Sequence, residues 1–266
     1  MKGSTVETQL KGWWALITGA SSGLGVDFAR ELAERGCNLV LVARREDLLR
    51  QHQQDLTKRY GVTVEIVALD LAIPNAPQRL YDQLQAAGRS IDILINNAGF
   101  GLYGPFLKTP WERERNMLEL DIMTLVHMTK LFISAMVNRN RGYVLQVSSI
   151  AAYQPSPLYA SYGAAKTFVL NFSEALNYEL RTTKVRCTVI APGVTATEFL
   201  AVSGQQPTLY ERLVMMKSPA VARIGIASML QGRPSVVPGR INTVMAVWSR
   251  LMPRRLSTMV AEILMR

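Results

Sequence analysis

Short, continuously apolar runs alternate with longer amphipathic stretches along most of this chain. Residues 14–17 and 38–43 contain no charged side chain, and residues 91–95 contain one aspartate. Strands that are apolar on both faces are typical of parallel sheets covered by helices on both sides. The alternation therefore predicts an α/β fold with a doubly wound parallel sheet of the Rossmann type.

About seven strands and five longer helices are expected. The strands are placed at residues 14–17, 38–43, 62–69, 91–95, 143–147, 185–190 and 235–237. The helices are placed at residues 24–35, 46–60, 111–137, 158–181 and 219–230, with two amphipathic or apolar segments at 241–252 and 257–265. No linker or repeat divides the chain, so we expect a single domain over residues 10–240 and an extension over residues 241–266.

Composition excludes two classes of protein. Hydrophobic residues make up 48% of the chain, too many for a disordered protein. The two cysteines are too few for a disulfide scaffold, and Cys37 and Cys187 lie in apolar runs, so buried, reduced thiols are expected. The N-terminus lacks the apolar core of a signal peptide, and no run of about 18 apolar residues occurs, so we expect a cytoplasmic protein.

Positive charge is concentrated near the C-terminus. The net charge is +10, and residues 217–266 contain eight Lys or Arg against one acidic residue, Glu262. This asymmetry indicates a polyanion, an anionic lipid surface or a phosphorylated substrate, or else only a solubilising face. The extension 241–266 is basic and amphipathic and carries Trp248, and two placements are open for it. It either contacts an anionic membrane peripherally or packs on the pocket or a neighbouring subunit. Nucleic-acid binding is not expected, since no binding motif is found.

A glycine-rich run separates the first expected strand from the first helix. The run is Thr18-Gly19-Ala20-Ser21-Ser22-Gly23-Leu24-Gly25. Glycine lets the backbone turn tightly and approach a pyrophosphate, whose negative charge then lies at the helix N-terminus. Its place between strand and helix predicts a dinucleotide-binding loop.

The end of the second strand favours NADP(H) over NAD(H). An NAD-binding protein carries an acidic residue there for the ribose 2′-hydroxyl, whereas this chain has Ala43-Arg44-Arg45. A guanidinium suits a 2′-phosphate, so Arg44 is the candidate ligand. The alternative is that both arginines only begin a charged helix.

Together with the glycine loop, four further motifs resemble the short-chain dehydrogenase/reductase family, in its single-domain, NADP(H)-preferring branch, over residues 10–237. They are Asp70-Leu71, Asn96-Asn97-Ala98-Gly99, Ser149 ahead of Tyr162-Gly163-Ala164-Ala165-Lys166, and Pro192-Gly193-Val194-Thr195-Ala196-Thr197. Each motif is weak alone, but their order and spacing are specific. The resemblance implies that the cofactor is bound by Gly19, Ser21, Ser22, Gly23, Leu24, Gly25, Arg44, Asp70, Leu71, Asn97, Ala98, Gly99, Tyr162, Lys166, Pro192, Gly193, Val194 and Thr197.

The resemblance also implies that Ser149, Tyr162 and Lys166 are catalytic. Hydride transfer to a carbonyl leaves an alkoxide, to which Tyr162 is expected to donate a proton. Lys166 lies on the same helix face, where its charge, together with the positive charge of the oxidised nicotinamide, is expected to favour the tyrosinate and lower the pKa of Tyr162. Ser149 is expected to donate a hydrogen bond to the substrate oxygen.

One position departs from the family pattern. The family has an asparagine in the long helix before the serine, where it holds a water in a proton relay from the lysine. Here that position is Asp121. An ionised aspartate accepts but does not donate hydrogen bonds, and its charge opposes a lowered tyrosine pKa. Asp121 is therefore either a fourth catalytic residue or a group that only bends the helix or forms a solvent bridge.

In the family a segment after the sixth strand closes the substrate pocket, which places a lid at residues 198–217. Its apolar residues are Phe199, Leu200, Val202, Leu209, Tyr210, Leu213, Val214, Met215 and Met216. Such a lid suits an apolar, lipid-like substrate, unless these residues only pack the lid on the body. Tyr153 and Tyr159 are interpreted as pocket wall or packing, and His52 as solvated. No spacing of His, Cys or carboxylates predicts a metal site.

The expected function is NADP(H)-dependent reduction of a ketone or aldehyde to an alcohol. The alternative is a non-catalytic, NADP(H)-sensing binding protein on the same fold. By resemblance, the helices at 111–137 and 158–181 form subunit contacts, so a homodimer or homotetramer is expected.

Overall fold

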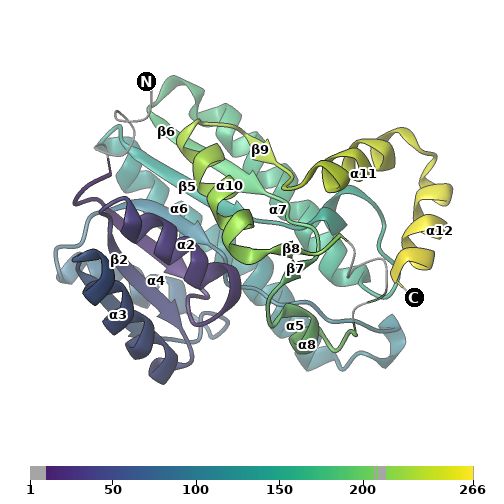
Figure 1. Cartoon of the computed structure of the whole chain (residues 1–266), viewed down its shortest axis with the longest axis horizontal. Coiled ribbons are helices and arrows are strands. Elements are labelled where there is room, and N and C mark those ends of the chain that lie inside the picture. Colours follow the sequence, from purple (N-terminus) through teal and green to yellow (C-terminus); the bar gives the residue numbers. More distant parts are fainter. Residues whose placement is uncertain (1–9, 207, 209–213, 266) are drawn as a thin grey trace.

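The central sheet has seven strands, and every pair of neighbours is parallel (Figure 1). The structure is a computed structural model that describes residues 10–206, 208 and 214–265. The strands are β1 (Trp14–Thr18), β2 (Asn38–Ala43), β3 (Val64–Ala68), β4 (Ile91–Asn96), β5 (Gly142–Val147), β6 (Val185–Ile190) and β9 (Ser235–Val236). The predicted doubly wound parallel sheet is confirmed.

The strand order is β3-β2-β1-β4-β5-β6-β9, so the winding direction reverses between β1 and β4. In sheets of this kind ligands bind at that reversal, just beyond the carboxyl ends of the strands. The glycine loop follows β1 and the Asn-Asn-Ala-Gly run spans the end of β4, which brings both motifs to this point.

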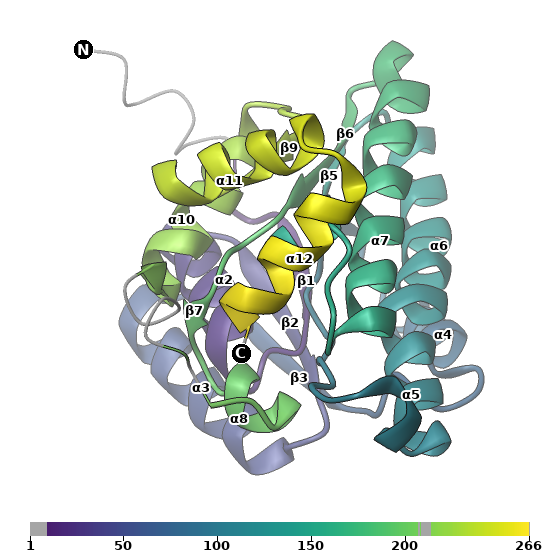
Figure 2. The same cartoon turned by 90° about the vertical axis from the view of Figure 1, so that its right-hand side faces the viewer.

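Helices cover both faces of the sheet, as Figure 2 shows edge on. One layer contains α2 (Gly23–Glu34), α3 (Glu46–Tyr60) and α10 (Ser218–Leu230), and the other contains α4 (Ala76–Ala86), α5 (Trp111–Leu118), α6 (Leu125–Asn138) and α7 (Ala160–Glu179). Ile17 and Leu41 pack with the first layer, whereas their neighbours Leu16 and Val40 pack with the second. Both faces of each inner strand are therefore buried, which explains the continuous apolar runs.

Two helical features differ from the sequence-based expectation. Helix α4 was not expected from the sequence; Leu80 and Leu84 are its two large aliphatic residues, and both are buried. The long helix expected at residues 111–137 is interrupted by one π-helical turn, η2 (Glu119–Thr124), which contains Asp121. Such a turn adds a residue to the helix and is frequent at functional sites.

The interrupted helix is also the one candidate for a membrane span among the described residues. Trp111–Asn138 has a mean hydropathy of 1.5 over an 18-residue window, although no uninterrupted apolar run marks it in the sequence. In the structure it packs on the sheet and contributes Met128, Phe132 and Met136 to the core.

The segments after β6 form smaller elements. Strands β7 (Thr195–Ala196) and β8 (Met216–Lys217) pair with each other, and α8 (Phe199–Ser203) lies between them in the chain. Of the expected lid residues, Leu209, Tyr210 and Leu213 lie outside the described residues. The extension folds as α11 (Arg240–Leu251) and α12 (Arg254–Met265), at the right-hand edge of Figure 1. The 3₁₀ turns are η1 (Phe106–Lys108), η3 (Ile150–Tyr153) and η4 (Leu180–Thr182).

Candidate active site

Three glycines let the loop after β1 turn tightly into α2. Gly19 and Gly23 have φ angles of +66° and +57°, which favour glycine. A Cβ on Gly25 would lie 2.2 Å from the carbonyl oxygen of Gly19. Ser22 is the N-cap of α2, but its side chain makes no capping hydrogen bond, so the first-turn N–H groups lack a side-chain cap. This cradle fits a dinucleotide pyrophosphate.

Thr18 and Asn97 join the carboxyl ends of β1 and β4 beneath that loop. Thr18 Oγ1 accepts hydrogen bonds from the N–H groups of Asn97 (3.0 Å) and Ala98 (2.9 Å). The Asn97 side-chain amide donates to the Thr18 carbonyl (2.9 Å) and the Gly19 carbonyl (3.3 Å). Asn97 therefore stabilises the conformation of the glycine loop through its first two residues.

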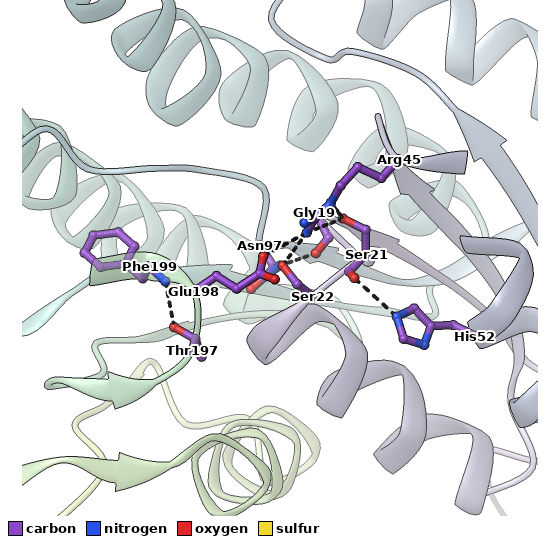
Figure 3. Close-up of polar contacts among 9 residues, drawn as sticks. All are labelled: Gly19, Ser21, Ser22, Arg45, His52, Asn97, Thr197, Glu198 and Phe199. Carbon is purple, nitrogen blue, oxygen red and sulfur yellow. Dashed lines mark hydrogen bonds and ion pairs between the residues drawn. The ribbon is translucent and has the colours of Figure 1, made fainter. Parts of the chain in front are cut away.

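Arg45, at the start of α3, reaches over the glycine loop (Figure 3). Its Nη2 donates to Ser22 Oγ (2.8 Å) and Ser21 Oγ (3.1 Å), and it pairs with Glu198 Oε2 at 3.0 Å. The guanidinium is thus hydrogen-bonded to two hydroxyl groups of the loop that is expected to bind the cofactor pyrophosphate. Hydrogen bonds from Arg45 and Ser22 hold the pKa of Glu198 below its ordinary value.

The residues just before and at the start of the expected lid pack against the glycine loop. A Cβ on Gly23 would be 3.1 Å from the side chain of Thr197. Thr197 Oγ1 in turn accepts a hydrogen bond from the Phe199 N–H at 3.2 Å. Thr197 and Glu198 therefore place the first residues of the expected lid beside the first turn of α2.

The part of the site that is expected to bind the adenosine of the cofactor is more exposed to solvent than the glycine loop. The Arg44 side chain is 75% exposed, and its Nη1 lies 4.0 Å from Asp70 Oδ2. Asp70 Oδ1 accepts a hydrogen bond from the Ala72 N–H (3.0 Å), and Leu71 is buried, with its carbonyl bound by the Thr124 hydroxyl (2.7 Å). Arg44 therefore remains accessible to a 2′-phosphate.

The loop after β6 is tied to the segment after Ser149. The Ile150 N–H donates to the Pro192 carbonyl at 2.8 Å, and the Met216 N–H donates to the Val194 carbonyl at 3.0 Å. Gly193 packs on Asn242 of α11, since a Cβ there would lie 2.5 Å from the Asn242 amide nitrogen. These contacts place the expected nicotinamide-binding loop beside the proposed serine.

Ser149, Tyr162 and Lys166 come together where α7 passes the carboxyl end of β5. Ser149 accepts a hydrogen bond from the Ala151 N–H (3.2 Å), and its hydroxyl is near enough to Tyr162 to lower the pKa of the tyrosine. Lys166 Nζ lies 5.6 Å from the centre of the Tyr162 ring and donates to the Val147 carbonyl at 3.3 Å. Tyr162 and Lys166 are both buried. The three side chains form a compact polar group at the end of the strand.

The pKa of Tyr162 lies above its ordinary value in the chain alone, whereas the lowered pKa expected from the sequence includes the charge of the oxidised nicotinamide. Burial raises it most, the charge of Asp121 raises it further, and the hydrogen bond with Ser149 lowers it. Neighbouring Lys166 is therefore not enough by itself to favour the tyrosinate.

Asp121 forms a buried ion pair with Lys166. Its Oδ2 lies 2.9 Å from Lys166 Nζ, and its Oδ1 accepts a hydrogen bond from the Phe100 N–H at 3.2 Å. Burial raises the pKa of Asp121, and the Lys166 ammonium opposes that rise. A Cβ on Gly99 would be 2.7 Å from Asp121 Oδ1, so Gly99, in the Asn-Asn-Ala-Gly run after β4, packs directly against the ion pair. The π-helical turn brings this carboxylate to the lysine.

Aromatic rings form the wall beside Tyr162. Ring centres lie 5.3 Å apart for Tyr103 and Tyr159, 5.5 Å for Tyr159 and Tyr162, and 5.4 Å for Tyr162 and Phe199. Leu102 and Met117 complete the cluster. The Tyr159 hydroxyl donates to Gln205 Oε1 (2.7 Å) and lies 3.0 Å from Ser203 Oγ, so Tyr159 is part of the wall and is tied to the end of α8.

Three residues near the loop were missed or misplaced by sequence reasoning. Arg45, rather than Arg44, contacts the loop hydroxyls, and Glu198 had been singled out only as the start of the lid. His52 is half-buried, with Nε2 3.2 Å from the Ser21 carbonyl oxygen, so its interpretation as a solvated side chain was wrong. The only sequence signal for Arg45 is the Arg-Arg pair after β2.

Comparisons with known proteins agree with this geometry. The short chain dehydrogenase family model matches residues 13–208. The human very-long-chain 3-oxoacyl-CoA reductase is 33% identical over 229 residues, 83% of this chain and 71% of that protein. The Macaca fascicularis counterpart is 32% identical over the same fractions.

Solved structures superpose over most of the chain. A 7β-hydroxysteroid dehydrogenase has a TM-score of 0.86 and 25% identity, covering 96% of this chain and 98% of that chain. A short-chain dehydrogenase from Sphingobium yanoikuyae, in complex with NADPH, has a TM-score of 0.81 and 29% identity, covering 90% and 92%. The chain therefore belongs to the short-chain dehydrogenase/reductase family of oxidoreductases.

Proposed function

We propose that the protein is an NADP(H)-dependent carbonyl reductase that converts an apolar ketone or aldehyde to an alcohol. The observation that carries the proposal is the group formed by half-buried Ser149 and buried Tyr162 and Lys166, at the carboxyl edge of the sheet where the glycine cradle also lies. A proton donor, a hydrogen-bond donor and a cation at one point supply what carbonyl reduction requires.

In this proposal, the chain's own residues handle the proton and the developing charge. When bound, NADPH supplies the hydride that reaches the carbonyl carbon. Tyr162 donates its hydroxyl proton to the carbonyl oxygen, and Ser149 donates a hydrogen bond to the same oxygen as negative charge develops. Lys166 stabilises the tyrosinate that remains, while Asp121 holds the Lys166 ammonium in place.

The cofactor would be held by the residues around the cradle. The proposed ligands of its phosphates and adenosine are Gly19, Ser21, Ser22, Gly23, Leu24, Gly25, Arg44, Asp70 and Leu71. The proposed ligands of its nicotinamide half are Asn97, Ala98, Gly99, Tyr162, Lys166, Pro192, Gly193, Val194 and Thr197.

Replacing Arg44 by Ala is expected to reduce the preference for NADPH over NADH. A charge-assisted hydrogen bond to the 2′-phosphate would be lost, so the ratio of the two kcat/KM values falls about tenfold or more. Arg50→Ala is the matched control, because this arginine pairs with Glu46 on the exposed side of α3. An unchanged ratio in Arg44→Ala would remove this proposed role.

Replacing Glu198 by Gln is expected to tighten NADPH binding by about two- to fivefold. Glu198 competes with the phosphates for Arg45 and places a negative charge beside them. Calorimetric titration of NADPH measures the effect, with Glu112→Gln on α5 as the control for loss of an exposed ion pair. Equal or weaker binding by Glu198→Gln would contradict this role.

Replacing Asp121 by Asn is expected to shift the pH profile of alcohol oxidation to lower pH. Oxidation needs the tyrosinate as base, and the charge of Asp121 raises the pKa of Tyr162. Removing that charge lowers the pKa, so oxidation reaches half its maximal rate at a lower pH. Glu119→Gln, an exposed change two residues away, should leave the profile in place. A profile shifted to higher pH would refute the coupling.

The apolar substrate class is inferred from the pocket wall and the relatives. Tyr159, Phe199, Leu102 and Met117 surround the position next to Tyr162. Two similar proteins are named for 3-oxoacyl-CoA and hydroxysteroid substrates, both with extended apolar parts. We therefore expect higher kcat/KM for long-chain or steroid ketones than for sugar ketones. Equal or better use of sugar ketones would overturn the substrate class but leave the reductase proposal standing.

A further inference from the structure

The helix α11 packs on the body through its small and polar residues rather than its apolar ones. Asn242, Ala246 and Ser249 are buried, whereas Trp248 and Leu251 are 61% and 76% exposed. The exposed apolar residues of this helix are Ile241, Val244, Val247, Trp248 and Leu251, which lie along one face. Burial is thus inverted relative to an ordinary surface helix.

The next helix, α12, repeats the inversion. Ser257 and Ala261 are buried, whereas Leu256, Met259 and Ile263 are 47%, 61% and 72% exposed. Within the described part of the chain, these two helices carry half of the large hydrophobic side chains that are exposed. We call the exposed apolar residues of α11 and α12 the C-terminal apolar face.

Positive charges flank this face. Arg240, Arg250, Arg254 and Arg255 are exposed on the two helices, and Glu262 is the only acidic residue after position 217. If two copies met across this face, a two-fold axis would bring these arginines together without matching carboxylates. The charge therefore favours an anionic partner over a second copy of the chain.

We propose that the C-terminal apolar face docks on an anionic lipid bilayer. Helices with an apolar face, flanking arginines and an exposed tryptophan lie in the plane of a membrane interface, where guanidinium groups bind lipid phosphates. The protein contributes two such helices in succession, joined at Pro253. The inference rests on their packing and charge and does not depend on the proposed function.

The opposite, buried side of α11 packs against segments of the candidate active site. Ser249 donates to the Tyr153 carbonyl (3.3 Å), and the Arg250 guanidinium lies 5.0 Å from the centre of the Tyr153 ring, in the turn that follows Ser149. Asn242 packs on Gly193 in the loop after β6. Figure 2 shows α12 in front of the body, between α11 and α8. A membrane on this face would lie beside the lid.

Flotation of the full chain with lipid vesicles tests the proposal. We expect the wild type to float with mixed phosphatidylcholine and phosphatidylserine vesicles but not with phosphatidylcholine alone, and high salt to weaken the binding. Trp248→Ser/Leu251→Ser and Arg254→Glu/Arg255→Glu should each weaken binding about tenfold or more. Melting curves of the same variants check that the fold is retained.

Matched controls separate this surface from general charge and hydrophobicity. Lys58→Glu/Arg59→Glu on α3 makes the same change in net charge, and Tyr178→Ser on α7 removes another exposed ring. Both controls should bind vesicles as the wild type does. The proposal is overturned if the wild type does not bind anionic vesicles. It is also overturned if the control variants lose as much vesicle binding as the test variants do. A dimer that dissociates in Trp248→Ser/Leu251→Ser overturns it too, since the face would then be a subunit interface.

Discussion

Replacing Tyr162 by Phe is expected to lower kcat for carbonyl reduction about a thousandfold, because the proton donor is lost while the ring remains. Tyr162 is buried, so water has little access to replace its hydroxyl. NADPH affinity should fall by no more than about tenfold, since the Tyr162 hydroxyl is one proposed cofactor contact while Lys166 and the glycine cradle are untouched. Steady-state NADPH consumption gives kcat, and titration of NADPH gives the affinity.

Tyr159→Phe is the matched control for that change. Its ring centre lies 5.5 Å from that of Tyr162, but its hydroxyl binds Gln205 and Ser203 at the lid. Loss of this hydroxyl should reduce kcat less than about tenfold. If Tyr162→Phe kept most of the activity, or Tyr159→Phe lost more, the proton donor would be another group.

Replacing Asp121 by Ala is expected to destabilise the protein by about 3–5 kcal/mol, the usual effect of breaking a buried ion pair. The Lys166 ammonium would remain buried with the Val147 carbonyl as its only other hydrogen-bond partner among the described contacts. Asp121→Asn keeps a hydrogen-bond acceptor for the lysine, so it should lower the free energy of unfolding by less than Asp121→Ala. Urea unfolding of the variants measures the free energies of unfolding.

Glu119→Ala, in the same π-helical turn but exposed, serves as the control and should change stability by less than about 0.5 kcal/mol. A small loss in Asp121→Ala would mean that Lys166 is solvated or neutral without its partner. The ion pair would then be dispensable for the fold, and Asp121 would retain only its proposed effect on the pKa of Tyr162.

Local patterns predicted the sheet and most motif positions. The apolar runs are continuous because inner strands such as β1 and β2 are buried on both faces, so the strands could be found from sequence alone. The glycine loop was equally visible, because its backbone geometry excludes side chains at Gly19 and Gly25.

Contacts between distant segments were not predictable in the same way. The pair of Arg45 and Glu198 joins residues 153 positions apart, and neither has a local signature. The π-helical turn around Asp121 leaves the apolar pattern of the long helix nearly unchanged. In α11, periodicity identifies the apolar face but not whether it is buried, and here the face with Trp248 is exposed.

The most direct test of the proposed reaction is NADPH consumption by the wild type with steroid ketones, 3-oxoacyl thioesters and long-chain aldehydes, followed by product analysis. We expect one alcohol formed for each NADPH oxidised with at least one of these classes, and no product with Tyr162→Phe. Tight NADPH binding without consumption of NADPH by any class would contradict the reductase proposal and favour a cofactor-sensing protein.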